Sequence, residues 1–308
     1  MKQYKAEIIA NVSNDLGEGP VWDESSDCLY WVDIEGNKIF RLDYYRNQIA
    51  WIEVNPYPST IILTNKHTMI ITAIDIIAEL PLFVFDESHG TKVNMYDSKI
   101  YHHSHRFLGK SEKDKMTRRF NDGKADASGR LWLGTMAIEQ EIGSKQGGLY
   151  CLNFKTPNPE LKLRIDATSI SNGLCWNNKQ GYFYFIDTKT YEIAKYKWIE
   201  STGEILNRSV CYTVDPVEGS PDGMTIDSNG MLWIALWGGY KVICVNPNNG
   251  ERVAEVSVGA ARVTCITFGG ADLKTMFITT AKDEDGNGGD LYIVESDVTG
   301  VGTYRAKS

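Results

Sequence analysis

Residues 220–233, SPDGMTIDSNGMLW, decide the fold of this chain. Asp222 stands near the start of this stretch, and a short run of alternating apolar and polar residues follows it. The triplet SNG at 228–230 then predicts a tight turn, and a second apolar run comes after it. The stretch therefore predicts two strands joined by a hairpin turn, with an acidic side chain just before the first strand.

The same pattern recurs along the chain. Short runs rich in β-branched and aromatic residues, separated by turn formers, begin near Gly19, Ser59, Asp122, Gly173, Gly223 and Thr264. The steps between these positions are about 40 to 63 residues, and a repeat of about 40 to 50 residues with short antiparallel strands is typical of a β-propeller. Almost no window has a helical period, which excludes a helical solenoid. A β-sandwich is the alternative, and the internal repeat argues against it.

We therefore predict an all-β fold, a six-bladed β-propeller with a central metal-binding channel, formed by residues 1–308 as a single domain. Residues 6–12, AEIIANV, would supply the outer strand of the last blade and close the ring. The longest step contains residues 87–118, which are polar and charged with weak periodicity. We interpret them as an insertion or lid loop over one face of the ring.

The composition limits which binding partners and which cellular compartment we expect for the protein. The formal net charge of -8 argues against binding to nucleic-acid phosphates. No apolar run reaches about 18 residues, so no membrane span is expected, and the N-terminus has no signal-peptide core. The six cysteines include no CxxC pair, which favours free buried thiols over disulfides. We expect a cytoplasmic protein.

Polar residues occupy one phase of the repeat at four places: Glu18, Asn121, Asn172 and Asp222. In a propeller, the loops that enter the innermost strands open at one mouth of the channel, so these side chains should meet there. Two carboxylates with amide oxygens form a hard donor set that suits one divalent cation, Ca²⁺, Mg²⁺ or Mn²⁺, with Zn²⁺ tolerated. Asp and Asn before strands are also ordinary turn formers, but four in one phase favour a site.

Several motifs together resemble the senescence marker protein/regucalcin/gluconolactonase family, which includes luciferin-regenerating enzymes. They are GEGPVW, RFNDGKADASGRLWLGTMA, SNGLCW, FYFIDT, PDGMTID and VTCITFGG, and the resemblance covers about residues 7 to 300. It implies a six-bladed propeller with one catalytic divalent cation, held by Glu18, Asn172 and Asp222. It also implies that Arg119, Asn121 and Glu139 bind substrate and that Asp222 is the general base. The insertion departs from the family pattern just before Arg119.

The resemblance predicts a metal-dependent lactonase, a carboxylic ester hydrolase that opens a sugar lactone or related small ester. A cation can polarise a carbonyl and acidify water, a carboxylate can take a proton, and an arginine can bind hydroxyls or a developing oxyanion. The alternatives are a non-catalytic calcium-binding regulatory protein of the regucalcin type and a scaffold with a vestigial channel. Metal-dependent turnover of a simple aldonolactone would separate the first class from the other two.

Overall fold

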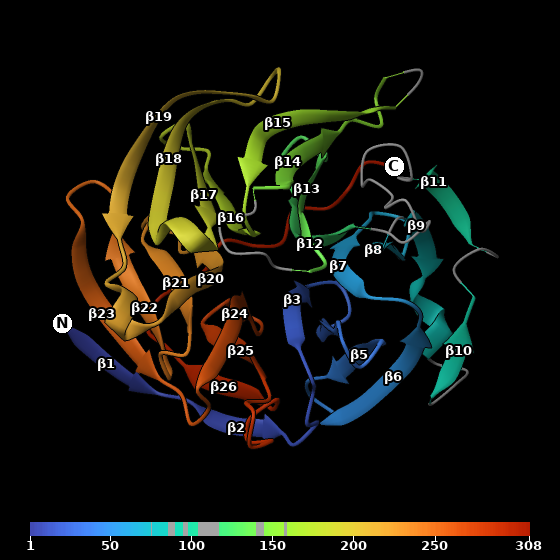
Figure 1. Ribbon diagram of the computed structural model, residues 1–308. Helices are drawn as coiled ribbons and strands as arrows, with labels where there is room; N and C mark the ends of the chain where they lie inside the picture. Colours follow the sequence, from blue (N-terminus) through green and yellow to red (C-terminus); the bar gives the residue numbers. More distant parts are fainter. Residues whose placement is uncertain (75, 86–89, 95–97, 104–116, 140–144, 157–158) are drawn as a thin grey trace.

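The computed structural model of the chain describes residues 1–74, 76–85, 90–94, 98–103, 117–139, 145–156 and 159–308. Strands dominate the described residues, which confirms the all-β prediction, and the sheets are placed around a common centre (Figure 1). The short 3₁₀ helices are η1 (Leu82–Phe85), η3 (Thr188–Thr190) and η4 (Pro216–Glu218).

The strands form antiparallel units of four, each beginning with the strand closest to the centre of Figure 1. The first two units contain β3 (Gly17–Asp23), β4 (Cys28–Asp33), β5 (Lys38–Asp43) and β6 (Gln48–Val54), then β7 (Pro58–Leu63), β8 (Thr68–Ala73), β9 (Ile76–Pro81) and β11 (Lys99–His103). The next two contain β12 (Arg118–Ala125), β13 (Leu131–Ala137), β14 (Gly147–Leu152) and β15 (Leu161–Thr168), then β16 (Ser171–Asn177), β17 (Tyr182–Asp187), β18 (Glu192–Ile199) and β19 (Glu204–Thr213).

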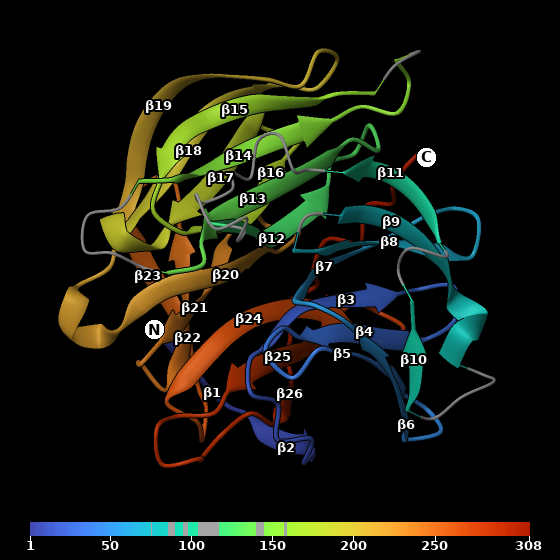
Figure 2. The same cartoon turned by 45° about the vertical axis from the view of Figure 1, so that its right-hand side comes forward.

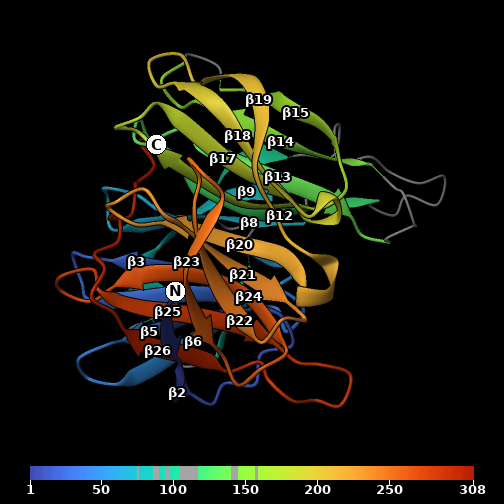
Figure 3. The ribbon, with the colours of Figure 1, turned by 90° about the vertical axis from the view of Figure 1, so that its left-hand side faces the viewer.

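The last two units complete the arrangement. They contain β20 (Ser220–Ile226), β21 (Leu232–Trp237), β22 (Lys241–Asn246) and β23 (Glu251–Ser257), then β24 (Arg262–Gly269), β25 (Thr275–Ala281), β26 (Leu291–Glu295) and β2 (Glu7–Ala10). These two units belong to one continuous sheet because Trp237 pairs with Arg262 across β21 and β24. Figure 3 shows the two units side by side.

The innermost strands contact one another in a closed cycle. β3 contacts β7, β7 contacts β12, and the series continues through β16, β20 and β24 back to β3. The N-terminal strand β2 pairs antiparallel with β26, so the prediction that residues near the N-terminus complete the last unit is confirmed. An N-terminal strand thus covers the outer edge of β26, the last strand of the chain.

Two further strands add to outer edges in a way that the sequence did not reveal. β1 (Lys2–Lys5) pairs parallel with β23, and β10 (Thr91–Val93) pairs parallel with β6 (Figure 2). Both β10 and β11 lie within the segment 87–118, for which we expected a loop. The described part of that segment therefore contributes strands to two units, whereas residues 104–116 lie outside the described part of the chain.

The turn after β20 shows how a side chain can fix a hairpin. The Asp227 carboxylate accepts hydrogen bonds from the backbone N–H groups of Asn229 and Met231 at 2.9 and 3.0 Å, and from Trp233 Nε1 at 3.0 Å. Gly230 has φ +83°, which a side chain would strain. One carboxylate thus closes the turn and positions the buried indole that follows it.

The core lies within and between the units. The tryptophans at equivalent places, Trp22, Trp132, Trp176 and Trp233, are each at most 3% exposed, as expected for packing residues. All six cysteines are free thiols; five of them are buried, as predicted, whereas Cys211 is half-buried. No helix among the described residues is long and apolar enough to cross a membrane.

Candidate functional site

The candidate residues lie at interruptions in the innermost strands. Along β20, Pro221 to Met224 spans three steps while the paired residues on β21 span two, so one extra residue is inserted. The same one-residue shift occurs in β3 after Glu18, in β12 after Phe120 and in β16 after Ser171. Such a bulge turns a side chain away from the regular ladder. The sequence placed these residues in loops before the strands, and the structure corrects this, because the bulges allow them to lie inside the strands.

The two carboxylates are buried with few partners. Glu18 is 8% exposed and Asp222 is 6% exposed. Among the described residues, the neighbouring Gly19 N–H is the hydrogen-bond donor to Glu18 Oε2, at 2.9 Å. Burial, followed by the nearby Asp122 charge, raises the pKa of Glu18 to about 8. Burial and then the Glu18 charge raise the pKa of Asp222 well above its usual range, so the two carboxylates oppose each other's ionisation.

The amide side of the site is a connected series of hydrogen bonds. Arg119 Nη1 donates to Asn121 Oδ1 at 2.8 Å and to the Phe120 carbonyl at 2.9 Å. Asn121 Nδ2 donates to Asn172 Oδ1 at 3.0 Å, and Asn172 Nδ2 donates to Thr188 Oγ1 at 2.8 Å. Burial lowers the pKa of Arg119, while nearby acids, among them Glu18 and Asp222, oppose this shift. The structure therefore brings Arg119, Asn121, Asn172, Glu18 and Asp222 into one electrostatic neighbourhood.

Glu139 has a different setting. It follows the end of β13, is exposed, and borders residues 140–144, which lie outside the described part of the chain. No contact between Glu139 and the buried group is seen among the described residues. Glu35, which is exposed, and Tyr57 act on Arg119 electrostatically instead. Neither residue could be recognised from the sequence, because both lie between strands and outside the phase of the repeat that holds the other candidates.

The donor chemistry fits a hard divalent cation. Glu18 and Asp222 supply carboxylates, and Asn172 supplies an amide oxygen. Within the described residues, no three His, Cys, Asp or Glu side chains gather into a metal site, so a cation would depend on the amide as well as the two acids. The raised pKa values express the cost of two buried negative charges, which a dication would remove.

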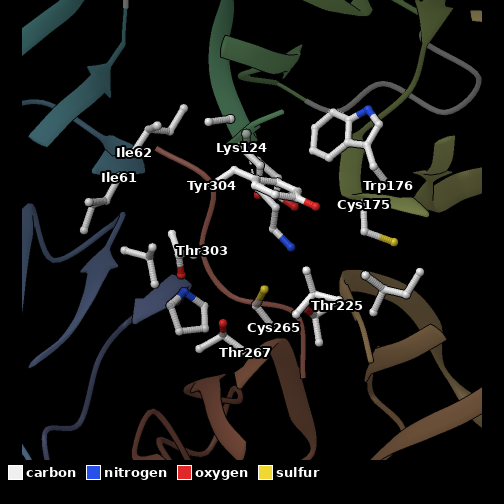
Figure 4. A pocket seen from close by; sticks show the side chains of 18 of the residues that line it. Ile61, Ile62, Lys124, Cys175, Trp176, Thr225, Cys265, Thr267, Thr303 and Tyr304 are labelled. Atoms are coloured by element: carbon white, nitrogen blue, oxygen red, sulfur yellow. Dashed lines mark hydrogen bonds between the residues drawn. The ribbon is translucent and has the colours of Figure 1, made fainter. Parts of the chain in front are cut away.

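A small cavity lies farther along the same innermost strands (Figure 4). Its volume is about 90 Å³, and it is lined by residues that follow the bulges, such as Thr225 and Cys265, and by Thr303 and Tyr304 of the C-terminal segment. Lys124 lies beside it and donates from Nζ to the Met224 carbonyl at 2.6 Å. Asp122 also lines it, and its Oδ2 has no hydrogen-bond partner among the described residues.

The comparisons with known proteins establish the family. Residues 16–282 match the SMP-30/Gluconolactonase/LRE-like region, and the chain belongs to this family. It is similar to the putative sugar lactone lactonase YvrE of Bacillus subtilis, with 38% identity over 269 residues that cover 87% of this chain and 84% of the relative. It is also similar to regucalcin of Gallus gallus, with 34% identity over 92% of this chain and 89% of the relative.

A solved structure shares the fold. A luciferin-regenerating enzyme superposes with a TM-score of 0.85 at 26% identity, covering 98% of this chain and 100% of the enzyme. The family resemblance drawn from the motifs is therefore confirmed.

Proposed function

We propose that the protein is a divalent-metal-dependent lactonase that opens a sugar lactone or a related small ester. The observation that carries the proposal is the placement of two buried, sparsely bonded carboxylates, Glu18 and Asp222, with the Asn172 amide and the Arg119 guanidinium. The relative named as a sugar lactone lactonase supports this choice of substrate class.

In this proposal, the closed cycle of innermost strands is the wall of a central channel, and the four-stranded units are the blades of a six-bladed propeller. Residues 1–308 form a single domain, in which the described part of the segment 87–118 adds strands at the outer edges of two blades. The free cysteines agree with work in a reducing cytoplasm.

Glu18, Asn172 and Asp222 would hold one cation, Ca²⁺, Mg²⁺, Mn²⁺ or Zn²⁺. When bound, such a cation supplies Lewis acidity toward the lactone carbonyl and lowers the pKa of a coordinated water. Asp222, whose ionised form a bound cation would favour, would accept the proton of the attacking water as general base. The water oxygen would bond to the lactone carbonyl carbon, the ring C–O bond would break, and the proton held by Asp222 would pass to the leaving alkoxide, which gives an open-chain hydroxy acid.

Arg119, Asn121 and Glu139 form the substrate side in the family assignment. Arg119 has the clearest support, because its Nη1 is held by Asn121 and Phe120 and its planar group is preoriented. It would donate to a substrate hydroxyl or to the oxyanion that develops at the carbonyl.

A panel of aldonolactones tests the proposal. The chelated protein is assayed alone and after addition of Mg²⁺, Mn²⁺, Zn²⁺ or Ca²⁺, and hydrolysis is followed by acid release. Turnover that requires a cation supports the proposal, and no turnover with any cation on any lactone contradicts it.

A non-catalytic calcium-binding role is the second candidate, since several relatives are named regucalcin. The same oxygen donors would suit Ca²⁺. Tight calorimetric binding of Ca²⁺ with no turnover on the lactone panel would favour this role.

A further inference from the structure

The Asn121 amide is occupied by the protein itself. Both hydrogens on Nδ2 are used, one toward the Ser171 carbonyl and one toward Asn172 Oδ1, each at 3.0 Å. Its Oδ1 accepts from Arg119 Nη1 at 2.8 Å. A primary amide offers two donors and one oxygen with two lone pairs, so Asn121 has no hydrogen left to donate to a substrate.

The partners of Asn121 fix the direction of its amide. A guanidinium can only donate, so the side of the amide that faces Arg119 must be the oxygen. A backbone carbonyl can only accept, so the side that faces Ser171 must be the NH₂ group. Ser171 is itself fully buried, and its Oγ donates to the Gly148 carbonyl at 3.1 Å.

This direction is passed on to Asn172. Because the Asn121 NH₂ group donates to it, the facing atom of Asn172 must be Oδ1. The Asn172 NH₂ group consequently faces Thr188, whose Oγ1 accepts at 2.8 Å. Asn172 Oδ1 has a second lone pair, which can serve as the electron-pair donor to a cation.

Thr188 is held in place from outside the site. It is 7% exposed and begins η3, and its backbone N–H donates to the Ile170 carbonyl at 3.2 Å. Asp187, which precedes it, accepts from the N–H groups of Ser169 and Ile170 at 3.0 to 3.1 Å. The hydroxyl therefore presents a fixed acceptor beside β16.

We propose that Asn121 and Thr188 are positioning residues that clamp the Asn172 amide from two sides and hold its oxygen ready for the cation. Asn121 then acts through Asn172 and ties Arg119 to it, instead of serving as a direct donor to substrate. The inference rests on the proposed function, because it gives Asn121 and Thr188 the role of orienting a proposed cation ligand.

Calorimetric titration of the chelated full-length protein with Mn²⁺, without lactone, tests the inference. Asn121→Ala should weaken Mn²⁺ binding about 10-fold or more, the range seen when a residue supporting a metal ligand is removed. Thr188→Val, which loses the acceptor but keeps the shape, should weaken it several-fold. Thr188→Ser should restore binding close to that of the parent, since the hydroxyl remains.

Two control variants remove the same kinds of side-chain group from the same two elements, away from Asn172. Asn177→Ala removes a buried amide at the far end of β16, where Oδ1 accepts from the Gln180 N–H at 3.1 Å. Thr190→Val removes a hydroxyl from the same η3 turn, where it donates to the Asp187 carbonyl at 2.8 Å. Both controls should bind Mn²⁺ as the parent does, and thermal unfolding should show that every variant is folded.

The outcomes separate the two proposals. If the parent binds Mn²⁺ and both Asn121→Ala and Thr188→Val bind it within twofold, the positioning role is overturned while the cation site stands. A rise in KM for the lactone in Asn121→Ala, with unchanged Mn²⁺ affinity, would show that Asn121 binds the substrate and does not position the cation ligand. If the parent itself binds no divalent cation, the proposed cation site fails and this inference fails with it.

Discussion

The candidate site has an amide side and a carboxylate side, and they differ in how many hydrogen-bond partners the protein itself provides. On the amide side, Arg119, Asn121, Asn172 and Thr188 form a continuous chain of hydrogen bonds of 2.8 to 3.0 Å. On the carboxylate side, Glu18 accepts one hydrogen bond from its own neighbour, and the pKa of Asp222 is shifted by burial and charge alone. The protein thus supplies hydrogen-bond partners for the amide half, whereas the negative charges of the carboxylate half have little compensation from the protein.

This difference explains the order in which changes should matter. Buried charge without a partner is costly, whereas hydrogen-bonded amides are already stable. A cation would therefore be bound mainly by the carboxylate half and aligned by the amide half.

The largest effect is expected from removal of a carboxylate. Asp222→Ala and Glu18→Ala should each weaken divalent-cation binding more than about 100-fold, which is beyond the loss seen for residues that only support a ligand. One carboxylate cannot balance a dication in a buried site. Calorimetry with Mn²⁺ measures the loss. Glu218→Gln, just before β20 and paired with Arg252 at the surface, is the control. Unchanged affinity in both alanine variants would disprove the metal assignment.

A large effect on turnover, without loss of the cation, is expected at Arg119. Arg119→Ala should lower kcat/KM for a polar lactone by about 100-fold, roughly 2.7 kcal/mol. Mn²⁺ affinity should stay within a few-fold, because Asn121 keeps its bonds to Ser171 and Asn172. Arg119→Lys should recover only part of the rate, since a point charge does not replace a two-pronged donor.

The adjacent arginine provides the control for that experiment. Arg118→Ala should leave kcat/KM unchanged, because neighbouring side chains on a strand point to opposite sides. Phe120, on the same side as Arg118, lies in an apolar cluster and is fully buried. If Arg119→Ala hydrolyses the lactone as fast as the parent, the substrate lies elsewhere on the ring.

The sequence was sufficient to predict much of this arrangement. Alternating strands and turns indicated the all-β units, and the common phase of Glu18, Asn121, Asn172 and Asp222 indicated one site. Side chains two residues apart on a strand point to the same side, and the hydrogen bond between Arg119 and Asn121 shows this arrangement on either side of Phe120.

Other features could not be read from the chain alone. A bulge depends on the register of the partner strand, so the sequence did not place Asp222 inside β20. Thr188 is separated from Asn172 by most of a hairpin, and only the folded register brings its hydroxyl to the amide. β10 is too short for its composition to reveal a strand, and only its pairing with β6 defines it.

Stability should depend on pH through the carboxylate half. Because the folded protein holds a proton on Glu18 up to about pH 8 while the unfolded chain releases it near its usual value, folding binds a proton between these limits. The cation-free protein should therefore lose stability as pH rises from about 5 to 8, by up to about 1.4 kcal/mol per pH unit for this group. Thermal unfolding across that range measures the slope.

Two controls separate the contribution of Glu18 from other titrations. Glu18→Gln should reduce the slope, since the neutral amide cannot ionise, while Asp222 still contributes because burial also raises its pKa. Saturating Mn²⁺ should also flatten or reverse it, because a bound cation favours the ionised carboxylate. A chelated parent whose unfolding temperature does not change between pH 5 and 8 would contradict the environment described for Glu18.

The smallest effect on cation binding is expected from Asn172→Asp. The substituted carboxylate can still accept from Asn121 Nδ2 with one oxygen, and the Thr188 hydroxyl can turn to donate to the other. The amide clamp therefore tolerates the change, and the added charge favours a dication. We expect Mn²⁺ affinity to be kept or raised, by calorimetry, while kcat falls because a third carboxylate weakens the Lewis acidity of the cation. Loss of Mn²⁺ binding in this variant would show that a carboxylate cannot replace the amide at this position.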